Sequence, residues 1–275
     1  MKRLRAMFLA PAALLMLATL VVPLAIVAAY SFLSRGAYGG VEAPWTYENY
    51  TRLFDPLYAT IFLRSAWVSL VATAGCIVLG FPLALFIARA GKRKNLYLAL
   101  VILPFWTSFL IRLYAWMFLL RDTGLVDTIL IELGLIHQPL QLLYNEGDVI
   151  LGLIYGYLPF AVLPLYATLE RQDPAMLDAA ADLGATPWRA LWRVTIPLAM
   201  PGIWAASILV FIPCLGTYIV SDLLGGSKTV LLGNLLQNQF TASRDWPFGA
   251  AASILLIAAA IAMLLLMRRS REELL

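Results

Sequence analysis

The sequence predicts an all-α membrane protein with six transmembrane helices, and three observations lead to this fold class. Hydrophobic residues make up 62% of the 275 residues and charged residues only 13%, about half the charged fraction of a soluble domain. Six apolar runs are long enough to cross a bilayer. Basic residues gather in alternate loops between these runs. We therefore expect a single transmembrane domain over residues 1–275, passing through a lipid bilayer several times.

Each of the six apolar runs is interpreted as one helical span. The first follows three basic residues, but its apolar stretch is longer than that of a signal peptide and lacks a small-residue cleavage site, so we expect it to remain as a span. In chain order, the predicted spans are Met7–Leu33, Arg64–Ala88, Leu96–Leu120, Val149–Leu169, Pro201–Leu223 and Phe248–Met267.

The distribution of basic residues predicts the orientation in the membrane. Thirteen of the twenty Lys and Arg lie in the N-terminal segment and in 89–94, 171–193 and 268–271. Loops with an excess of Lys and Arg face the cytoplasm, so both termini and the 171–193 loop are expected there. The net charge of +4 is explained by this asymmetry, and we expect no nucleic-acid partner.

The loop between the fourth and fifth spans contains a predicted helical hairpin over residues 173–197. Asp173 is a suitable N-cap and Pro174 a suitable first helical residue. Gly184 is expected to end this helix, Pro187 to begin a second one, and Pro197 to end the second. Because this polar hairpin interrupts an otherwise apolar chain, we expect it to be held by another protein.

The second helix of the hairpin has an apolar stripe, and the charged residues lie on other faces. Asp178 and Asp182 are four residues apart on the first helix, separated by alanines, while Arg189 is available to meet a partner's carboxylates. An amphipathic loop adsorbed to lipid headgroups is the alternative. The stripe has i, i+3, i+4, i+7 spacing and consists of Trp188, Leu191, Trp192 and Thr195.

The hairpin motif resembles the EAA loop of permease subunits of bacterial ABC importers. Asp-Ala-Ala at 178–180 is followed by Gly184 and then by Val-Thr-Ile-Pro at 194–197. The family has Glu at the position of Asp178. The resemblance implies that this loop docks in a groove of an ATPase subunit, and the residues that it assigns to coupling are Asp178, Ala179, Ala180, Gly184, Trp188, Arg189 and Pro197.

The same resemblance implies the architecture and the partners. We expect a type I importer permease fold in a bacterial inner (cytoplasmic) membrane. A second permease subunit would complete the pore, two ABC ATPase subunits would bind below it, and a periplasmic substrate-binding protein would bind above. ATP hydrolysis would be supplied by the ATPase subunits, so the chain itself is not expected to be an enzyme.

Four further stretches resemble permeases of spermidine/putrescine importers, and the resemblance extends from about residue 47 to 257. It implies a small cationic substrate, although related permeases carry other solutes. These stretches are Leu103–Trp116, Tyr218–Gly226, Leu232–Phe240 and Arg244–Ala250.

Flexible chains of ammonium groups bind best to carboxylates and aromatic faces. Asp222, one turn after Tyr218 at the outer end of the fifth span, could supply the carboxylate, or it could only solvate a helix end. The aromatic residues could equally be core or lipid-interface residues. A cation at Arg112 would repel such a substrate, so we expect Arg112 to pair internally, with a helix C-terminus or with carbonyl groups. The candidate pathway residues are Asp222, Tyr218, Trp106, Tyr114 and Gln237.

The sequence gives no sign of catalytic chemistry, a cofactor or a metal. His137 is the only histidine, so neither a Ser-His triad nor a histidine metal cluster is available. Cys76 and Cys214 lie in apolar runs and imply no disulfide. The alternatives to this function are an importer of another small solute and, from a different class, a secondary transporter. The latter predicts carboxylates deep within spans.

Overall fold

The computed structural model describes residues 2–272. Among these residues, five helices are long and apolar enough to cross a membrane, and a bent pair of helices forms a sixth candidate span. The chain divides into two compact units. The first contains residues 2–60 and 235–262, and the second contains residues 61–234 and 263–272.

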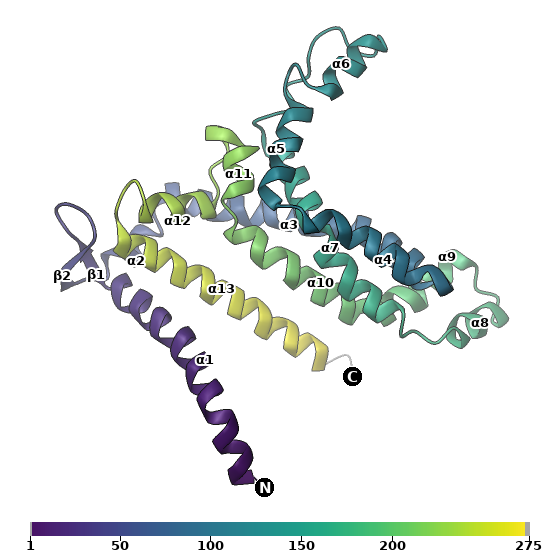
Figure 1. Ribbon diagram of the computed structural model, residues 1–275, viewed down its shortest axis with the longest axis horizontal. Coiled ribbons are helices and arrows are strands. Elements are labelled where there is room, and N and C mark those ends of the chain that lie inside the picture. Colours follow the sequence, from purple (N-terminus) through teal and green to yellow (C-terminus); the bar gives the residue numbers. More distant parts are fainter. Residues whose placement is uncertain (1, 273–275) are drawn as a thin grey trace. The chain divides into compact units, whose positions relative to one another are not determined.

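The elements are mostly helical, with one short two-stranded hairpin (Figure 1). In chain order they are α1 (Lys2–Ser31), β1 (Leu33–Arg35), β2 (Val41–Trp45), α2 (Glu48–Arg52), α3 (Pro56–Ala88), η1 (Gly91–Arg93), α4 (Lys94–Ile102), η2 (Leu103–Trp106), α5 (Phe109–Leu120), α6 (Leu125–Glu132), α7 (Glu146–Leu169), α8 (Ala175–Asp182), α9 (Pro187–Ala190), η3 (Leu191–Thr195), α10 (Ile196–Gly216), α11 (Ile219–Leu223), η4 (Gly226–Lys228), α12 (Leu232–Phe240) and α13 (Trp246–Glu272).

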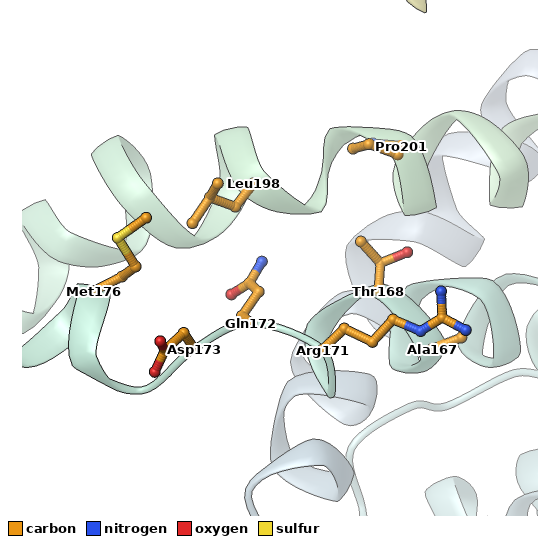
Figure 2. A pocket seen from close by; sticks show the side chains of 8 residues that line it. All are labelled: Ala167, Thr168, Arg171, Gln172, Asp173, Met176, Leu198 and Pro201. Carbon is orange, nitrogen blue, oxygen red and sulfur yellow. The ribbon is translucent and has the colours of Figure 1, made fainter. Parts of the chain in front are cut away.

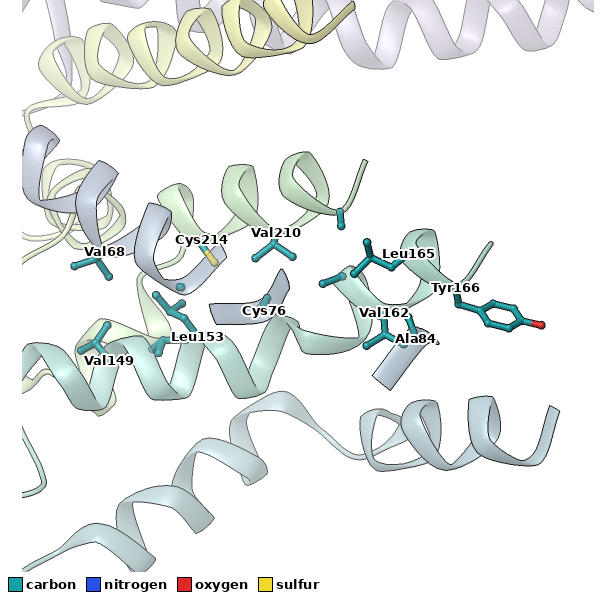
Figure 3. Packing of buried hydrophobic residues seen from close by; sticks show 14 of the residues in the cluster. Val68, Cys76, Ala84, Val149, Leu153, Val162, Leu165, Tyr166, Val210 and Cys214 are labelled. Atoms are coloured by element: carbon teal, nitrogen blue, oxygen red, sulfur yellow. The ribbon is translucent and has the colours of Figure 1, made fainter. Parts of the chain in front are cut away.

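The core of the second unit lies between α3, α7 and α10. Val68, Leu153, Leu165 and Val210 are fully buried there (Figure 3). The helices α7 and α10 pack along each other because small residues let the backbones approach. At Gly202, for example, an added Cβ would lie 2.8 Å from the Cβ of Thr168. This packed pair positions the hairpin at one of its ends.

The third predicted span is not one helix. The segments Gly91–Trp106 and Phe109–Glu132 meet at an angle of 85°. Thr107 and Ser108 have extended backbones, with ψ of 153° and 133°, and interrupt the helical hydrogen bonds. Hydropathy does not detect such a break, because the apolar composition is the same on both sides. The prediction of a continuous helix over Leu96–Leu120 was therefore wrong.

The fifth span differs from its predicted limits at both ends. A continuous helical segment runs from Pro187 to Gly216, so Pro197 does not end the second hairpin helix as predicted. Its first part includes the π-helical turn η3. The wider π turn lets Pro197 enter the first turn of α10, where a proline is tolerated.

The first unit contains the strand hairpin, which the sequence analysis did not predict. β1 and β2 are antiparallel, and α2 is tied to them because the buried amide of Asn49 donates to the carbonyl oxygens of Ser31 and Leu33 at 3.0 and 2.8 Å. Arg52 forms an ion pair with the buried Asp245 at 3.0 Å. These contacts fix the loop that follows α1.

Candidate functional site

The first half of the hairpin is α8, which has a defined cap at each end. Asp173 accepts a hydrogen bond from the Ala175 N–H at 3.0 Å, and the helix begins at Ala175, one residue later than predicted. At the other end, Gly184 has φ of +79°. The N–H of Gly184 donates to Ala181 O at 2.8 Å and that of Ala185 to Ala180 O at 2.9 Å. This pattern is a Schellman motif.

The second half begins at α9 and is attached to the body of the protein at its base. Thr186 accepts a hydrogen bond from the Arg189 N–H at 3.4 Å, as expected for an N-cap. The side-chain amide of Gln172, in the linker before α8, donates to the Thr195 carbonyl at 3.0 Å. Thr195 itself is fully buried. The two ends of the hairpin are thus held together.

The tip of the hairpin presents apolar side chains that the chain itself does not cover. Trp188 and Trp192 are 68% and 56% exposed, and their rings meet edge to face with centroids 5.9 Å apart. Leu183 is almost fully exposed. Asp178 and Arg189 are also exposed. Large exposed aromatic residues rimmed by charges are typical of a protein-binding surface.

An open pocket of about 530 Å³ lies at the base of the hairpin. Figure 2 shows Gln172 and Asp173 on the linker facing Leu198 of α10, with Met176 of α8 beside them. Arg171 is the one basic residue that lines it. The pocket opens between the linker and the start of α10, close to the Gln172–Thr195 hydrogen bond that holds the base of the hairpin.

An ion pair next to this base connects α4 to the end of α7. Lys94 donates a hydrogen bond to Glu170. Hydrogen bonding from Lys94 and then from Tyr166 holds the pKa of Glu170 below its ordinary value. Glu170 is therefore ionised at neutral pH, and it connects the bent third span to the linker of the hairpin.

At the opposite end of α10, the structure brings Tyr218 and Asp222 together on one helical turn. The chain is extended at Thr217, and α11 follows as a separate short helix. The Asp222 N–H donates to the Tyr218 carbonyl at 2.8 Å, and Asn234 and Ser221 donate to the same carbonyl at 3.4 and 3.0 Å. The Asp222 side chain is exposed.

The other predicted pathway residues do not converge on this turn. Trp106 is 83% exposed beside the break in the third span, and Tyr114 on α5 is half exposed. Neither stacks on Tyr218 among the described residues. Gln237 is exposed on α12, and its carbonyl accepts a hydrogen bond from Thr241 at 2.6 Å. A role in substrate passage for these residues stays a prediction.

The sequence had led us to expect that Arg112 pairs with a helix C-terminus or carbonyl groups, but no such hydrogen bond from its side chain is found among the described residues. Its guanidinium carbon lies 4.1 Å from the centre of the Phe105 ring, 5.5 Å from Phe109 and 5.7 Å from Tyr155. The last of these rings belongs to α7, more than forty residues along the chain. The sequence showed that Arg112 is an unusual cation within a predicted span, but it did not indicate that Tyr155 would lie near it.

Residues 77–271 match the model of the binding-protein-dependent transport system inner membrane component. The chain belongs to this family. It is therefore an integral protein of a bacterial inner membrane with a transport role, and the predicted class is confirmed.

The permease has close relatives by sequence. It is 46% identical over 225 residues to the spermidine/putrescine transport system permease protein PotB of Escherichia coli K12, covering 82% of each chain. The protein of the same name from Haemophilus influenzae is 44% identical and covers 85% of this chain and 82% of its own.

Solved structures support the fold. A bacterial ABC transporter involved in the import of the acidic polysaccharide alginate matches with a TM-score of 0.74 and 19% identity, covering 98% of this chain and 95% of its own. The MetNI methionine ABC transporter matches with a TM-score of 0.58 and 18% identity, covering 79% and 95%. The importer permease fold predicted from the sequence is thereby confirmed.

Proposed function

We propose that this chain is a permease subunit of an ATP-driven importer of polyamines such as spermidine and putrescine. The observation that carries the proposal is the 46% identity over 82% of the chain to a spermidine/putrescine permease. At this identity the pathway that contacts substrate is expected to keep its chemistry. The fold alone would not indicate the substrate, because the structural neighbours belong to transporters of unlike solutes.

The hairpin over residues 173–197 is the coupling element in this proposal. Its exposed Trp188 and Trp192 would fill a groove of an ATPase subunit, and Asp178 and Arg189 would meet complementary charges at the rim. The partners are two such ATPase subunits, a second permease and a periplasmic binding protein. ATP hydrolysis takes place in the ATPase subunits, and the hairpin transmits their closure to the pore as a rigid-body movement.

The proposal includes an orientation in the membrane. The hairpin, with both chain termini, is on the cytoplasmic side, as the distribution of Lys and Arg predicts. Tyr218 and Asp222 are then near the periplasmic side, where a substrate arrives from the binding protein. An exposed carboxylate one turn from an aromatic ring suits an ammonium group.

The test is transport by the reconstituted importer. The chain would be purified with the second permease and the ATPase subunits, placed in proteoliposomes, and supplied with the binding protein. We expect ATP-dependent uptake of radiolabelled spermidine or putrescine, abolished by a catalytically inactive ATPase. Uptake without ATP would indicate a secondary transporter. ATP-dependent uptake of another solute, with no polyamine carried, would refute the substrate assignment.

A further inference from the structure

Arg112 occupies an aromatic cage whose chemistry matches that of the proposed substrate. The rings of Phe105, Phe109 and Tyr155 surround the guanidinium at 4.1, 5.5 and 5.7 Å, all within the range of cation–π attraction. The three rings come from η2, α5 and α7, so the cage is a product of the fold. An aromatic cage of this kind also binds the ammonium groups of small ligands.

The guanidinium of the half-buried Arg112 has two nitrogen atoms without a hydrogen-bond partner among the described residues. These are its buried Nε and Nη1 atoms. The ion pairs found in those residues join Arg52 to Asp245, Arg64 to Glu146 and Lys94 to Glu170, and none includes Arg112. Buried N–H groups without acceptors are unfavourable. The rings are therefore the contacts found for this guanidinium group in the described part of the chain, and a competing cation would replace those contacts.

A cavity lies beside the cage, and the break in the third span lies between two of the cage residues. A cavity of about 400 Å³ adjoins Arg112 and is lined mainly by apolar and aromatic side chains, among them Tyr157 and Phe160 of α7. Phe105 precedes the 85° break at Thr107–Ser108, and Arg112 follows it. A change in this angle would withdraw Arg112 from Phe105, because the two residues lie on opposite sides of the break.

We propose that Phe105, Phe109 and Tyr155 form a cation site on the translocation pathway, which Arg112 occupies at rest and an ammonium group of the substrate occupies during transport. This rests on the proposed function, since it names a contact for that substrate. Two cations cannot share the cage, because like charges a few ångströms apart in a medium of low dielectric repel strongly. Arg112 therefore excludes cations until the break moves, and the site fills only in the transporting state.

The test is binding of radiolabelled spermidine to the purified permease–ATPase complex, with the binding protein left out. Removing the resident cation in Arg112→Gln should tighten spermidine binding by about 3- to 30-fold, the range that cation–π attraction spans. Arg121→Gln is the matched control, because Arg121 also lies over an aromatic ring, that of Phe118 at 4.2 Å, but is outside the cage. It should leave the Kd unchanged.

A second pair of variants tests the rings. In the Arg112→Gln background, Tyr155→Leu should return the Kd toward that of the unmodified chain, whereas Tyr155→Phe keeps the ring and should not. An unchanged or weaker Kd in Arg112→Gln overturns the proposal. So does loss of uptake that Arg112→Lys restores, because a fixed positive charge would then be required.

The outcome remains decisive if Arg112→Gln does not assemble. Tyr155→Leu and Tyr155→Phe are then compared in the otherwise unmodified importer during transport, with the binding protein and ATP present, and equal spermidine uptake refutes the cage. Failure of the proposed function is separate: a wild-type importer supplied with its binding protein would take up no polyamine. If it does take up polyamine and the two Tyr155 variants take up spermidine alike, only the cage is refuted.

Discussion

Replacement of Gly184 by valine tests whether the hairpin transmits motion to the pore. In the structure, the only expected effect of the added side chain is backbone strain. Gly184 has φ of +79°, and an added Cβ would meet no atom within 4 Å. The substitution therefore introduces backbone strain without a steric clash. A left-handed conformation costs an L-residue about 1–2 kcal/mol, so the fraction of hairpins with the native turn should fall by about 5- to 30-fold relative to alternatives.

The alternatives are hairpins in which the Schellman hydrogen bonds of Gly184 and Ala185 are broken and α9 points elsewhere. We expect Gly184→Val to abolish polyamine uptake by the reconstituted importer and to reduce co-purification of the ATPase. The amount of permease in the membrane should stay close to that of the wild type, because the turn lies outside the packed core.

Two control variants distinguish the effect of backbone strain from the effect of the position of Gly184 in the hairpin. Gly91 has φ of +57° and an equally empty surrounding, so Gly91→Val introduces similar strain outside the hairpin and should leave coupling intact. Asparagine tolerates the left-handed region, so Gly184→Asn should retain most uptake. Wild-type transport by Gly184→Val, or an equal loss in Gly91→Val, would refute the coupling role.

Four further predictions address the substrate contact, the orientation, an ion pair and the core. Asp222→Asn keeps the side-chain shape and removes the charge, so polyamine uptake should fall strongly while the complex assembles; uptake at the wild-type rate would reduce Asp222 to a helix-end residue. In a cysteine-labelling experiment from outside, a substitution at Glu132 should react and one at Ala185 should not; reaction at Ala185 would reverse the orientation. Because the pKa of Glu170 is lowered, its ion pair with Lys94 persists as the pH falls and is lost only when Glu170 becomes protonated. The Tm difference between wild type and Glu170→Gln should thus be equal at pH 7 and 5 and shrink below about pH 4. A Tm difference that vanishes by pH 5 would contradict this. Gly202→Val would place a Cβ 2.9 Å from the Pro164 carbonyl oxygen and should destabilise the α7–α10 packing by about 1–3 kcal/mol, measured as a lower Tm. An unchanged Tm would show that the two helices accommodate the added side chain without loss of packing.

Local signals in the sequence predicted the spans and the hairpin, because hydropathy and capping residues act over a few neighbouring positions. Gly184 ends a helix as expected, since its left-handed conformation depends on its own missing side chain. The prediction that Pro197 ends the second hairpin helix was wrong, because whether a proline stops a helix depends on the turn before it, here the π turn at 191–195. The break at Thr107–Ser108 had no compositional signal.

The substrate side was less predictable for a different reason. Tyr218 and Asp222 lie close in sequence, and their adjacency on one helical turn was foreseen. The partners of Arg112 include Tyr155 on another helix, so they depend on how the spans pack. In the proposed assembly a second permease completes the pore, and the residues that line it are then defined by both chains.

The unbroken helix from Pro187 to Gly216 has a mechanical consequence. Its 30 residues span about 45 Å at 1.5 Å per residue, so the segment that we propose meets the ATPase and the segment that leads to Tyr218 would act as two arms of one lever. A tilt of about 5° at one arm would move the other by roughly 4 Å over that length, about the width of a methylene chain. No relay of side chains is needed between the nucleotide side and the substrate side. A flexible joint inserted in this lever would let the ATPases turn over while the solute stayed outside.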